Sequence, residues 1–270
     1  SSFIRWLTLI AVIGFSSLIY GQMNSPKPVL KLRLLLDRQF GSVAVMALAL
    51  GMVMYGSTYV IPQFLAIISD YNAFQTGLVI FWMGIPAFLL MPVLPFMLRR
   101  IHIRIAVGVG MLLMAISCFV SISLTAQSGG AVFTEGQLIR GVGMILSMMF
   151  LNQATVASVA KADAGDASGI FNAARNLGGS FALAGLASFQ DQRIWHHSRR
   201  MEESLNANSV SVQNHLDGLA RNFGGMDGAM AMLSRTIQRE AFVMTYNDVF
   251  LAMGILTLAT VPLVVFLKPL

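Results

Sequence analysis

Long apolar runs constrain this chain more than any other feature. A helix needs about 20 mostly apolar residues to cross the hydrocarbon core of a bilayer. Seven runs approach or exceed that length: Phe3–Tyr20, Val43–Ile67, Gly77–Leu98, Ile105–Thr125, Gln137–Ala160, Ala167–Phe189 and Val249–Leu267. None of them alternates with a period of two, as the strands of a membrane barrel do. We therefore expect an all-α integral membrane protein, because a helix satisfies its own backbone groups within lipid.

Composition agrees with lipid as the surrounding solvent. The chain is 56% apolar and 11% charged, whereas soluble domains are about 45–50% apolar and about 25% charged. The net charge of +6 does not indicate nucleic acid, because the basic residues lie in short connections that orient a chain in the bilayer. The single cysteine, Cys118, leaves no internal disulfide and no cysteine-bound zinc. His196-His197 lacks a metal-binding frame, so we predict no metal site there.

The short connections predict the orientation of the chain. The first and third connections carry the basic residues Lys27, Lys31, Arg33, Arg38, Arg99, Arg100 and Arg104. The second and fourth carry no Lys or Arg. Cytoplasmic loops are enriched in these residues, so the first and third connections should face the cytoplasm. We expect a multi-pass protein embedded in the lipid bilayer of the inner cell membrane, with its carboxy terminus in the cytoplasm.

The connection at 190–245 is long and lies outside in this orientation. Its apolar residues recur at helical spacing in two series, Val212, Leu216, Leu219 and Phe223, then Met226, Met230, Leu233, Ile237, Ala241 and Met244. Gly224-Gly225 separates the two series as a turn. We predict an extracytoplasmic helical hairpin over 190–245.

Several motifs resemble a known transporter family. The run Gly165-Asp166-Ala167-Ser168-Gly169-Ile170-Phe171-Asn172, followed by Arg175-Asn176-Leu177-Gly178-Gly179-Ser180, is similar to the signature of EmrB/QacA-type exporters. These are the fourteen-helix drug:proton antiporters of the major facilitator superfamily. Three further motifs agree in order and spacing: Leu36-Asp37-Arg38-Gln39-Phe40 with Tyr55-Gly56-Ser57-Thr58 and Pro62, then Ile139-Arg140-Gly141-Val142-Gly143, then Tyr246-Asn247-Asp248. The resemblance extends from about residue 26 to the end of the chain.

The resemblance implies two six-helix halves with two extra helices between them. It assigns 1–22 to a linker transmembrane helix, 23–41 to a cytoplasmic basic loop, and 42–270 to the carboxy-terminal six-helix half, an inverted three-plus-three repeat. The amino-terminal half, which in this family carries the antiporter motif and the acids linked to proton coupling, is missing. A start at Ser1-Ser2 instead of Met fits a piece of a longer chain. Relatives in bacteria with two membranes work with a periplasmic adaptor, for which 190–245 is a docking surface or a lid.

Polar and aromatic residues inside the runs are candidates for lining a substrate cavity. They are Tyr55, Thr58, Gln63, Phe64, Trp82, Phe150, Asn152 and Gln153. Polar side chains in lipid need partners and therefore face other helices or a cavity, and adaptable aromatic and Met surfaces suit promiscuous binding. Ordinary packing or lipid contact is the alternative interpretation of each aromatic residue. The glycines of Gly141-x-Gly143 and Gly178-Gly179 predict close helix approach.

Ionisable residues give four candidates for gating or coupling: Arg140, Asp166, Arg175 and Asp248. Arg140 lies within a span, where a charge is costly and suggests a function. It is interpreted either as a gate or relay that faces the cavity or as a side chain that snorkels to the outer interface. Asp166 and Arg175 lie on the same side of the membrane and are candidates for a pair.

Secondary transport is the leading functional hypothesis: proton-coupled export of amphipathic drugs or toxic compounds, without enzymatic activity or cofactor. The sequence contains no Walker A motif, so ATP is not the evident energy source. One alternative is an inert half-transporter, since alternating access needs two halves that move around a shared site. Another is a seven-helix receptor, although a retinal protein would need a lysine within its last span, and that span has none before Lys268.

Overall fold

The computed structural model describes residues 6–7, 9–10, 12–14, 16–17, 20–21, 32–204, 210–222 and 225–267. All regular elements in this part of the chain are helices: η1 Leu32–Leu36, α2 Arg38–Ile67, α3 Ala73–Leu90, α4 Leu94–Arg100, α5 Ile103–Val120, α6 Val132–Ala157, η2 Lys161–Asp163, α7 Ala164–Ser204, α8 Val210–Asn222, α9 Met226–Thr260 and η3 Val261–Phe266. The predicted linker helix at 1–22 lies largely outside the described residues. The basic loop expected at 23–41 is described from residue 32, where it forms η1 and the start of α2.

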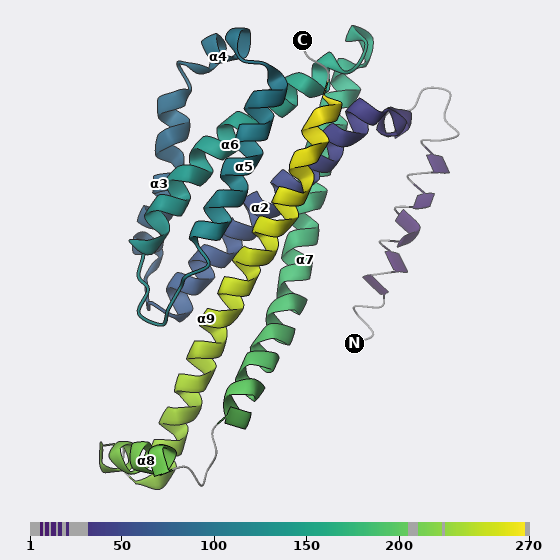
Figure 1. Ribbon diagram of the computed structural model, residues 1–270. Helices are drawn as coiled ribbons and strands as arrows, with labels where there is room; N and C mark the ends of the chain where they lie inside the picture. The colour runs from purple at the N-terminus through teal and green to yellow at the C-terminus, as the bar shows by residue number, and fades with distance from the viewer. Residues whose placement is uncertain are drawn as a thin grey trace.

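The long helices α2, α3, α5, α6, α7 and α9 run side by side in one bundle (Figure 1). Helix α2 contacts α3, α6, α7 and α9, so it lies near the centre. Helix α3 packs mainly on α6 and is otherwise uncovered, with only Thr76 and Val79 buried along its length. This arrangement confirms the predicted all-α membrane architecture.

Four helical stretches in the described residues are long and apolar enough to cross a membrane on their own: Arg38–Ile67, Ala73–Leu90, Ile103–Val120 and Met226–Phe266. Helices α6 and α7 coincide with two further predicted spans but are more polar. Helix α6 carries Glu135 and Arg140, and α7 mixes apolar residues with many polar and charged ones. Because α6 packs against α3, α5, α7 and α2, its polar groups need not meet lipid.

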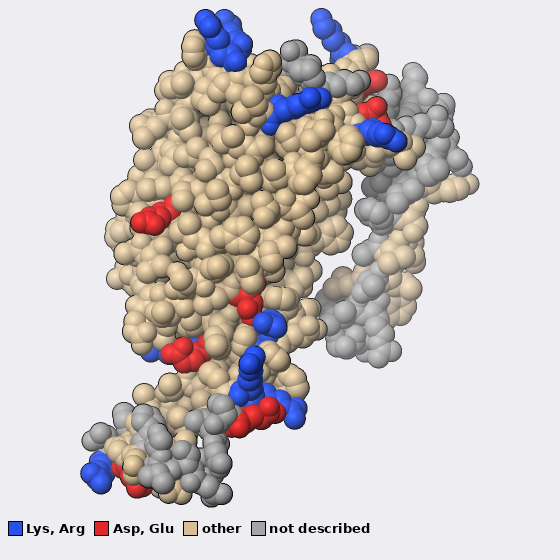
Figure 2. Space-filling model, in the orientation of Figure 1, with Lys and Arg blue, Asp and Glu red and all other residues tan. Residues whose placement is uncertain are grey.

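Charged side chains gather at the two ends of the bundle. Figure 2 shows a broad band between these ends that carries no Lys or Arg on the visible face, although acidic atoms are visible at its left edge. Helix α4, with Arg99 and Arg100, and the start of α2, with Arg38, lie at the same end of the bundle (Figure 1). A band without basic side chains between ends that carry them fits a bundle that crosses a bilayer.

Capping residues set the beginnings of α2 and α3. The Asp37 carboxylate accepts hydrogen bonds from the backbone N–H groups of Gln39 and Phe40, at 2.9 and 3.1 Å. Asn72 and Gln75 form a reciprocal capping box at the start of α3. Each cap satisfies N–H groups that the first turn of a helix leaves without an intrahelical partner.

Helices α7 and α9 are much longer than a membrane span. They have 41 and 35 residues, or roughly 60 and 50 Å at 1.5 Å per residue, against about 30 Å of hydrocarbon. Both extend beyond one end of the bundle, and α8 lies at the tip of the extension (Figure 1). Both apolar series of 190–245 are helical where they are described, and Gly225 precedes α9 with a positive φ of 102°. However, the second series belongs to α9, which runs on into the last span, and residues 190–204 belong to α7. The predicted hairpin region is therefore continuous with the bundle.

Candidate functional site

A strip of polar side chains follows one face of α2. It consists of Tyr55, Tyr59 and Gln63, which follow one another at four-residue intervals on one face, and of Thr58, three residues after Tyr55. Thr58 and Tyr59 are exposed, and Tyr55 and Gln63 are half-buried. We call these four residues the α2 strip. Tyr59 belongs to it although the sequence analysis did not select it; its spacing from Tyr55 and Gln63 was the available signal.

Two amide side chains of α7 bind the α2 strip. The Tyr55 hydroxyl donates to Asn176 Oδ1 at 3.2 Å, and Gln190 Nε2 donates to Gln63 Oε1 at 3.0 Å. Sequence reasoning placed Asn176 in the family signature but did not pair it with Tyr55, and it missed Gln190. The result is a seam of neutral donors and acceptors between two membrane helices.

Glycines bring the two backbones of this seam together. A methyl group on Gly178 would overlap the Leu48 carbonyl, and one on Gly51 would overlap the Arg175 carbonyl. A methyl on Gly179 would overlap the Tyr55 ring. The close approach predicted for Gly178-Gly179 is therefore confirmed. These glycines fix the distance across which Tyr55 and Gln63 reach α7.

Arg140 lies in the interior between α5, α6 and α9. Its Nη1 donates to Gln137 Oε1 at 2.9 Å, its Nε donates to Ser117 Oγ at 3.3 Å, and its guanidinium carbon is 6.0 Å from the centre of the Phe250 ring. The residue is 1% exposed, so the snorkelling interpretation is wrong. Its Nη2 is buried without a hydrogen-bond partner in the described residues. A gating role stays a prediction.

The aromatic candidates differ in their surroundings. Phe64 and Phe150 are fully buried, and Phe64 packs edge-on against Phe133 and Tyr246, with ring centres 5.4 and 5.2 Å apart. Ordinary core packing therefore describes both residues. Trp82 is 41% exposed, so it remains available to a ligand.

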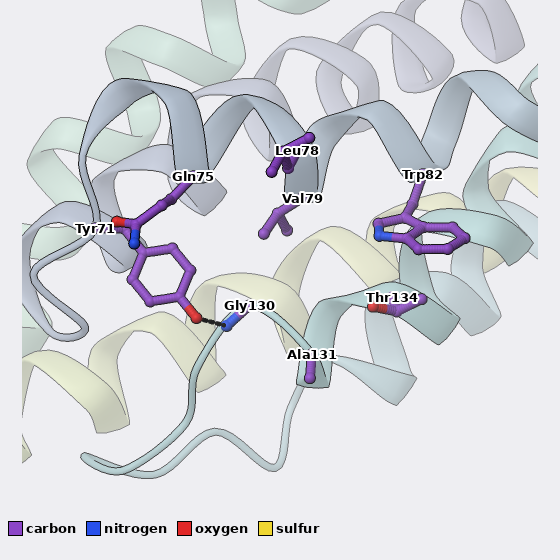
Figure 3. A pocket seen from close by; sticks show the side chains of 8 residues that line it. All are labelled: Tyr71, Gln75, Leu78, Val79, Trp82, Gly130, Ala131 and Thr134. Carbon is purple, nitrogen blue, oxygen red and sulfur yellow. Dashed lines mark hydrogen bonds between the residues drawn. The ribbon is translucent and has the colours of Figure 1, made fainter.

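Trp82 borders an open cavity of about 340 Å³ between α3 and α6. The cavity is lined by Tyr71, Gln75, Leu78, Val79, Trp82, Gly130, Ala131 and Thr134 (Figure 3). The Gly130 N–H donates to the Tyr71 hydroxyl at 3.0 Å and closes one end. An indole beside a few neutral polar groups suits an apolar or amphipathic guest.

Asn152 and Gln153 lie farther along α6, and both are half-buried. The Gln153 Oε1 atom is buried without a partner in the described residues. On the neighbouring side of α6, a methyl on Gly141 would overlap the Met83 carbonyl of α3, and one on Gly143 would lie 2.9 Å from the Gly110 carbonyl oxygen of α5. The predicted close approach at Gly141-x-Gly143 is thus also confirmed.

Asp248 joins α9 to α7 at the end of the bundle that bears the extension. Its Oδ2 accepts from Arg193 Nε at 2.7 Å and lies 2.6 Å from His197 Nε2. The neighbouring Asn247 makes two hydrogen bonds to the backbone of Leu124, both at 3.0 Å. The motif Tyr246-Asn247-Asp248 thus fastens α9 both to the loop after α5 and to α7. Sequence reasoning selected Asp248 but did not find its partners.

Asp166 and Arg175 do not form the pair that was considered for them. Both lie on α7, nine residues apart in sequence, or about 13 Å along the helix axis. Arg175 Nη1 instead points to the Met148 sulfur at 3.6 Å, and its Nε is buried without a partner in the described residues. Across those residues no group of three His, Cys, Asp or Glu could hold a metal ion.

Comparison with known proteins places this arrangement in a family. The model of the Major Facilitator Superfamily matches residues 6–183. The chain belongs to the major facilitator superfamily. The seven-helix receptor was suggested by the number of spans alone. Membership in this superfamily assigns the same helices to another fold and removes that alternative.

Relatives that match this chain include proteins named for colistin resistance, multidrug export and fatty acid resistance. Colistin resistance protein EmrB of Acinetobacter baumannii is 26% identical over 269 residues, which cover 98% of this chain and 52% of that protein. Multidrug export protein EmrB of Escherichia coli K12 is 24% identical over 269 residues, covering 97% and 52%. Fatty acid resistance protein FarB of Neisseria gonorrhoeae is 24% identical over 265 residues, covering 97% and 52%. The resemblance to EmrB-type proteins is therefore confirmed, and the chain spans about half the length of these relatives.

Proposed function

We propose that this chain is one half of a multidrug efflux transporter and that the whole protein exports amphipathic drugs or toxic compounds in exchange for protons. The observation that carries the proposal is the α2 strip, a row of neutral hydrogen-bonding groups on a central helix of an apolar bundle. Uncharged donors and acceptors beside aromatic surface hold amphipathic compounds of varied shape without demanding one geometry. The relatives named for multidrug export and for colistin and fatty acid resistance support this substrate class.

The other half of the transporter is the first partner in this proposal. Helix α3 is largely uncovered, and its exposed residues include Phe74, Phe81 and Phe88, at 75%, 65% and 78% exposure. Exposed aromatic residues of this size suit a second protein wall or lipid. A cavity that opens alternately to the two sides needs such an opposing wall.

The lipid bilayer and a periplasmic adaptor complete the proposed environment. We place the protein in the inner membrane with the ends of α4 and α9 in the cytoplasm, because Arg99 and Arg100 lie at that end of the bundle. The extension formed by α7, α8 and α9 would then project into the periplasm. Its length beyond the bundle supports a docking surface better than a lid, which would need to fold back over the cavity.

Dye efflux tests the proposal. The reading frame that contains this chain is expressed in cells that lack their own efflux pumps, and loss of an accumulated amphipathic dye is followed by fluorescence. We expect energised efflux, weakened by Gln63→Leu and Tyr55→Phe, with Thr236→Val on the exposed outer part of α9 as the control. Efflux that is absent, or equally fast in all variants, would refute the role of the α2 strip.

An inert half-transporter is the competing function. It predicts that the chain inserts and folds but never increases efflux, even when a complementary amino-terminal half is supplied. The same efflux assay separates the two functions, because only the proposed transporter gains activity from the complementary half.

A further inference from the structure

A groove lies where the beginning of α2 meets the helical turn η3. It encloses about 360 Å³, and its walls include Leu35, Leu36, Val45, Leu263 and Phe266. Leu36 is 85% exposed, and Val45 and Phe266 are each 48% exposed. The apolar walls therefore open to the surroundings of the bundle, which for this part of a membrane protein are lipid.

The groove is polar at one end and apolar along the rest of its length. Arg38, Ser42 and Val45 line it from α2, at spacings of four and three residues along one helix face. Val45 lies about 10 Å deeper than Arg38 along the helix axis. This order, a cation at the membrane edge followed by apolar walls, matches a lipid with an anionic headgroup and an acyl chain.

Arg38 is available to a ligand. Asp37 also lines the groove, and its carboxylate accepts hydrogen bonds from the backbone N–H groups of Gln39 and Phe40 as the helix cap. No ion pair with Arg38 occurs in the described part of the chain. Arg104 does not line the groove, and its Nε donates to the carbonyl of Leu267. Guanidinium groups match the geometry of phosphate oxygens better than other cationic side chains do.

We propose that this groove binds one anionic phospholipid, with its phosphate at Arg38 and an acyl chain along Val45, Leu263 and Phe266. The site is independent of the α2 strip and of the proposed transport activity. None of the described residues between 6 and 21 lines the groove. A soluble anion would use Arg38 but gain nothing from the apolar walls, which is why a lipid fits better than free phosphate.

Native mass spectrometry of the purified protein tests the site. The probes are phosphatidylglycerol, phosphatidylcholine with the same acyl chains, and inorganic phosphate alone. We expect one phosphatidylglycerol per chain to be retained preferentially. Arg38→Gln should weaken this binding about fivefold, because one arginine near a membrane surface contributes about that factor toward an anionic lipid. Val45→Trp should weaken it as well, by filling the groove at an exposed position.

Arg99→Gln is the matched control, because it removes an arginine from the same end of the bundle but outside the groove. It should leave phosphatidylglycerol binding unchanged. Equal retention of phosphatidylcholine, or equal loss in Arg99→Gln, would overturn the proposal in favour of arginines that only orient the chain. Binding of inorganic phosphate that phosphatidylglycerol fails to displace would overturn it in favour of a soluble anion. Failure of both lipids to bind, as expected if another segment of the chain fills the groove, would also overturn it.

Discussion

Replacing Gly178 by Ala should loosen the seam between α2 and α7. The added methyl group would overlap the Leu48 carbonyl, and this atom belongs to the backbone, so it cannot rotate away. The two helices must separate, and the contact between Gly51 and the Arg175 carbonyl one turn away opens with them. The perturbation therefore reaches both backbones, although it adds a single carbon atom.

The size of the effect follows from the contacts that are lost. Forcing an extra methylene into a packed interior costs about 1–3 kcal/mol. The hydrogen bonds from Tyr55 to Asn176 and from Gln190 to Gln63 span the same seam, and each contributes about 0.5–1.5 kcal/mol. Together they give a loss of about 2–6 kcal/mol. Thermal unfolding should then occur roughly 5–25 °C lower, at a few degrees per kcal/mol for a chain of this size.

Cys118 provides the assay, because it is the only cysteine and it is buried. A dye that fluoresces on reaction with a thiol reports unfolding as this residue becomes accessible. Gly185→Ala is the matched control on α7, since a methyl group there meets nothing within 4 Å and removes a poor helix former. Its unfolding temperature should stay level or rise. An unfolding temperature for Gly178→Ala equal to that of Gly185→Ala would refute the close packing of this seam.

Three further substitutions test the fastening of α9 and the buried arginine. Asn247→Ala should destabilise the protein by about 1–3 kcal/mol, since it leaves both backbone groups of Leu124 unpaired. The thiol assay measures the loss of stability, and an unchanged unfolding temperature would contradict the prediction. Asp248→Asn should weaken the contact with Arg193 by about 1 kcal/mol at this partly exposed site. Amide hydrogen exchange over 190–204 should become faster, and unchanged exchange would count against the prediction. Arg140→Met should leave stability level or raise it, because none of the described carboxylates pairs with the buried guanidinium. It should also lower efflux if the residue gates transport. A fall of several degrees in the unfolding temperature would show that the guanidinium is needed for packing.

Helix positions were accessible from the sequence because long apolar runs have few alternative structures in lipid. The runs at 43–67 and 105–125 begin and end within about five residues of α2 and α5, and the run at 249–267 covers the last part of α9 together with η3. Close approach at Gly141 and Gly178 was also predictable, since glycine in a membrane helix commonly marks a contact. The length of α9 was not, because the apolar series beginning at Met226 and the last span were read as separate helices.

Side-chain partners depend on where helices distant in sequence meet, and the sequence does not state this. Gln63 and Gln190 are 127 residues apart and bind only because α2 and α7 lie side by side. Phe64 was a cavity candidate by residue type, but the face of α2 on which it lies turns inward to Phe133. Arg140 was placed at the outer interface by one interpretation, and Gln137 and Ser117 instead hold it inside. Composition identified the residues of interest, and packing decided what each one contacts.

Transport driven by a proton gradient is the most direct test of the central claim. The protein encoded by the whole reading frame is reconstituted into vesicles, a pH gradient is imposed across the membrane, and movement of an amphipathic dye is recorded for the native protein and for Gln63→Leu. We predict dye movement that requires the gradient, collapses when a protonophore is added, and is slower in Gln63→Leu. Dye movement that persists without the gradient would contradict proton coupling, and an absence of movement in any condition would contradict the assignment of this chain to a multidrug efflux transporter.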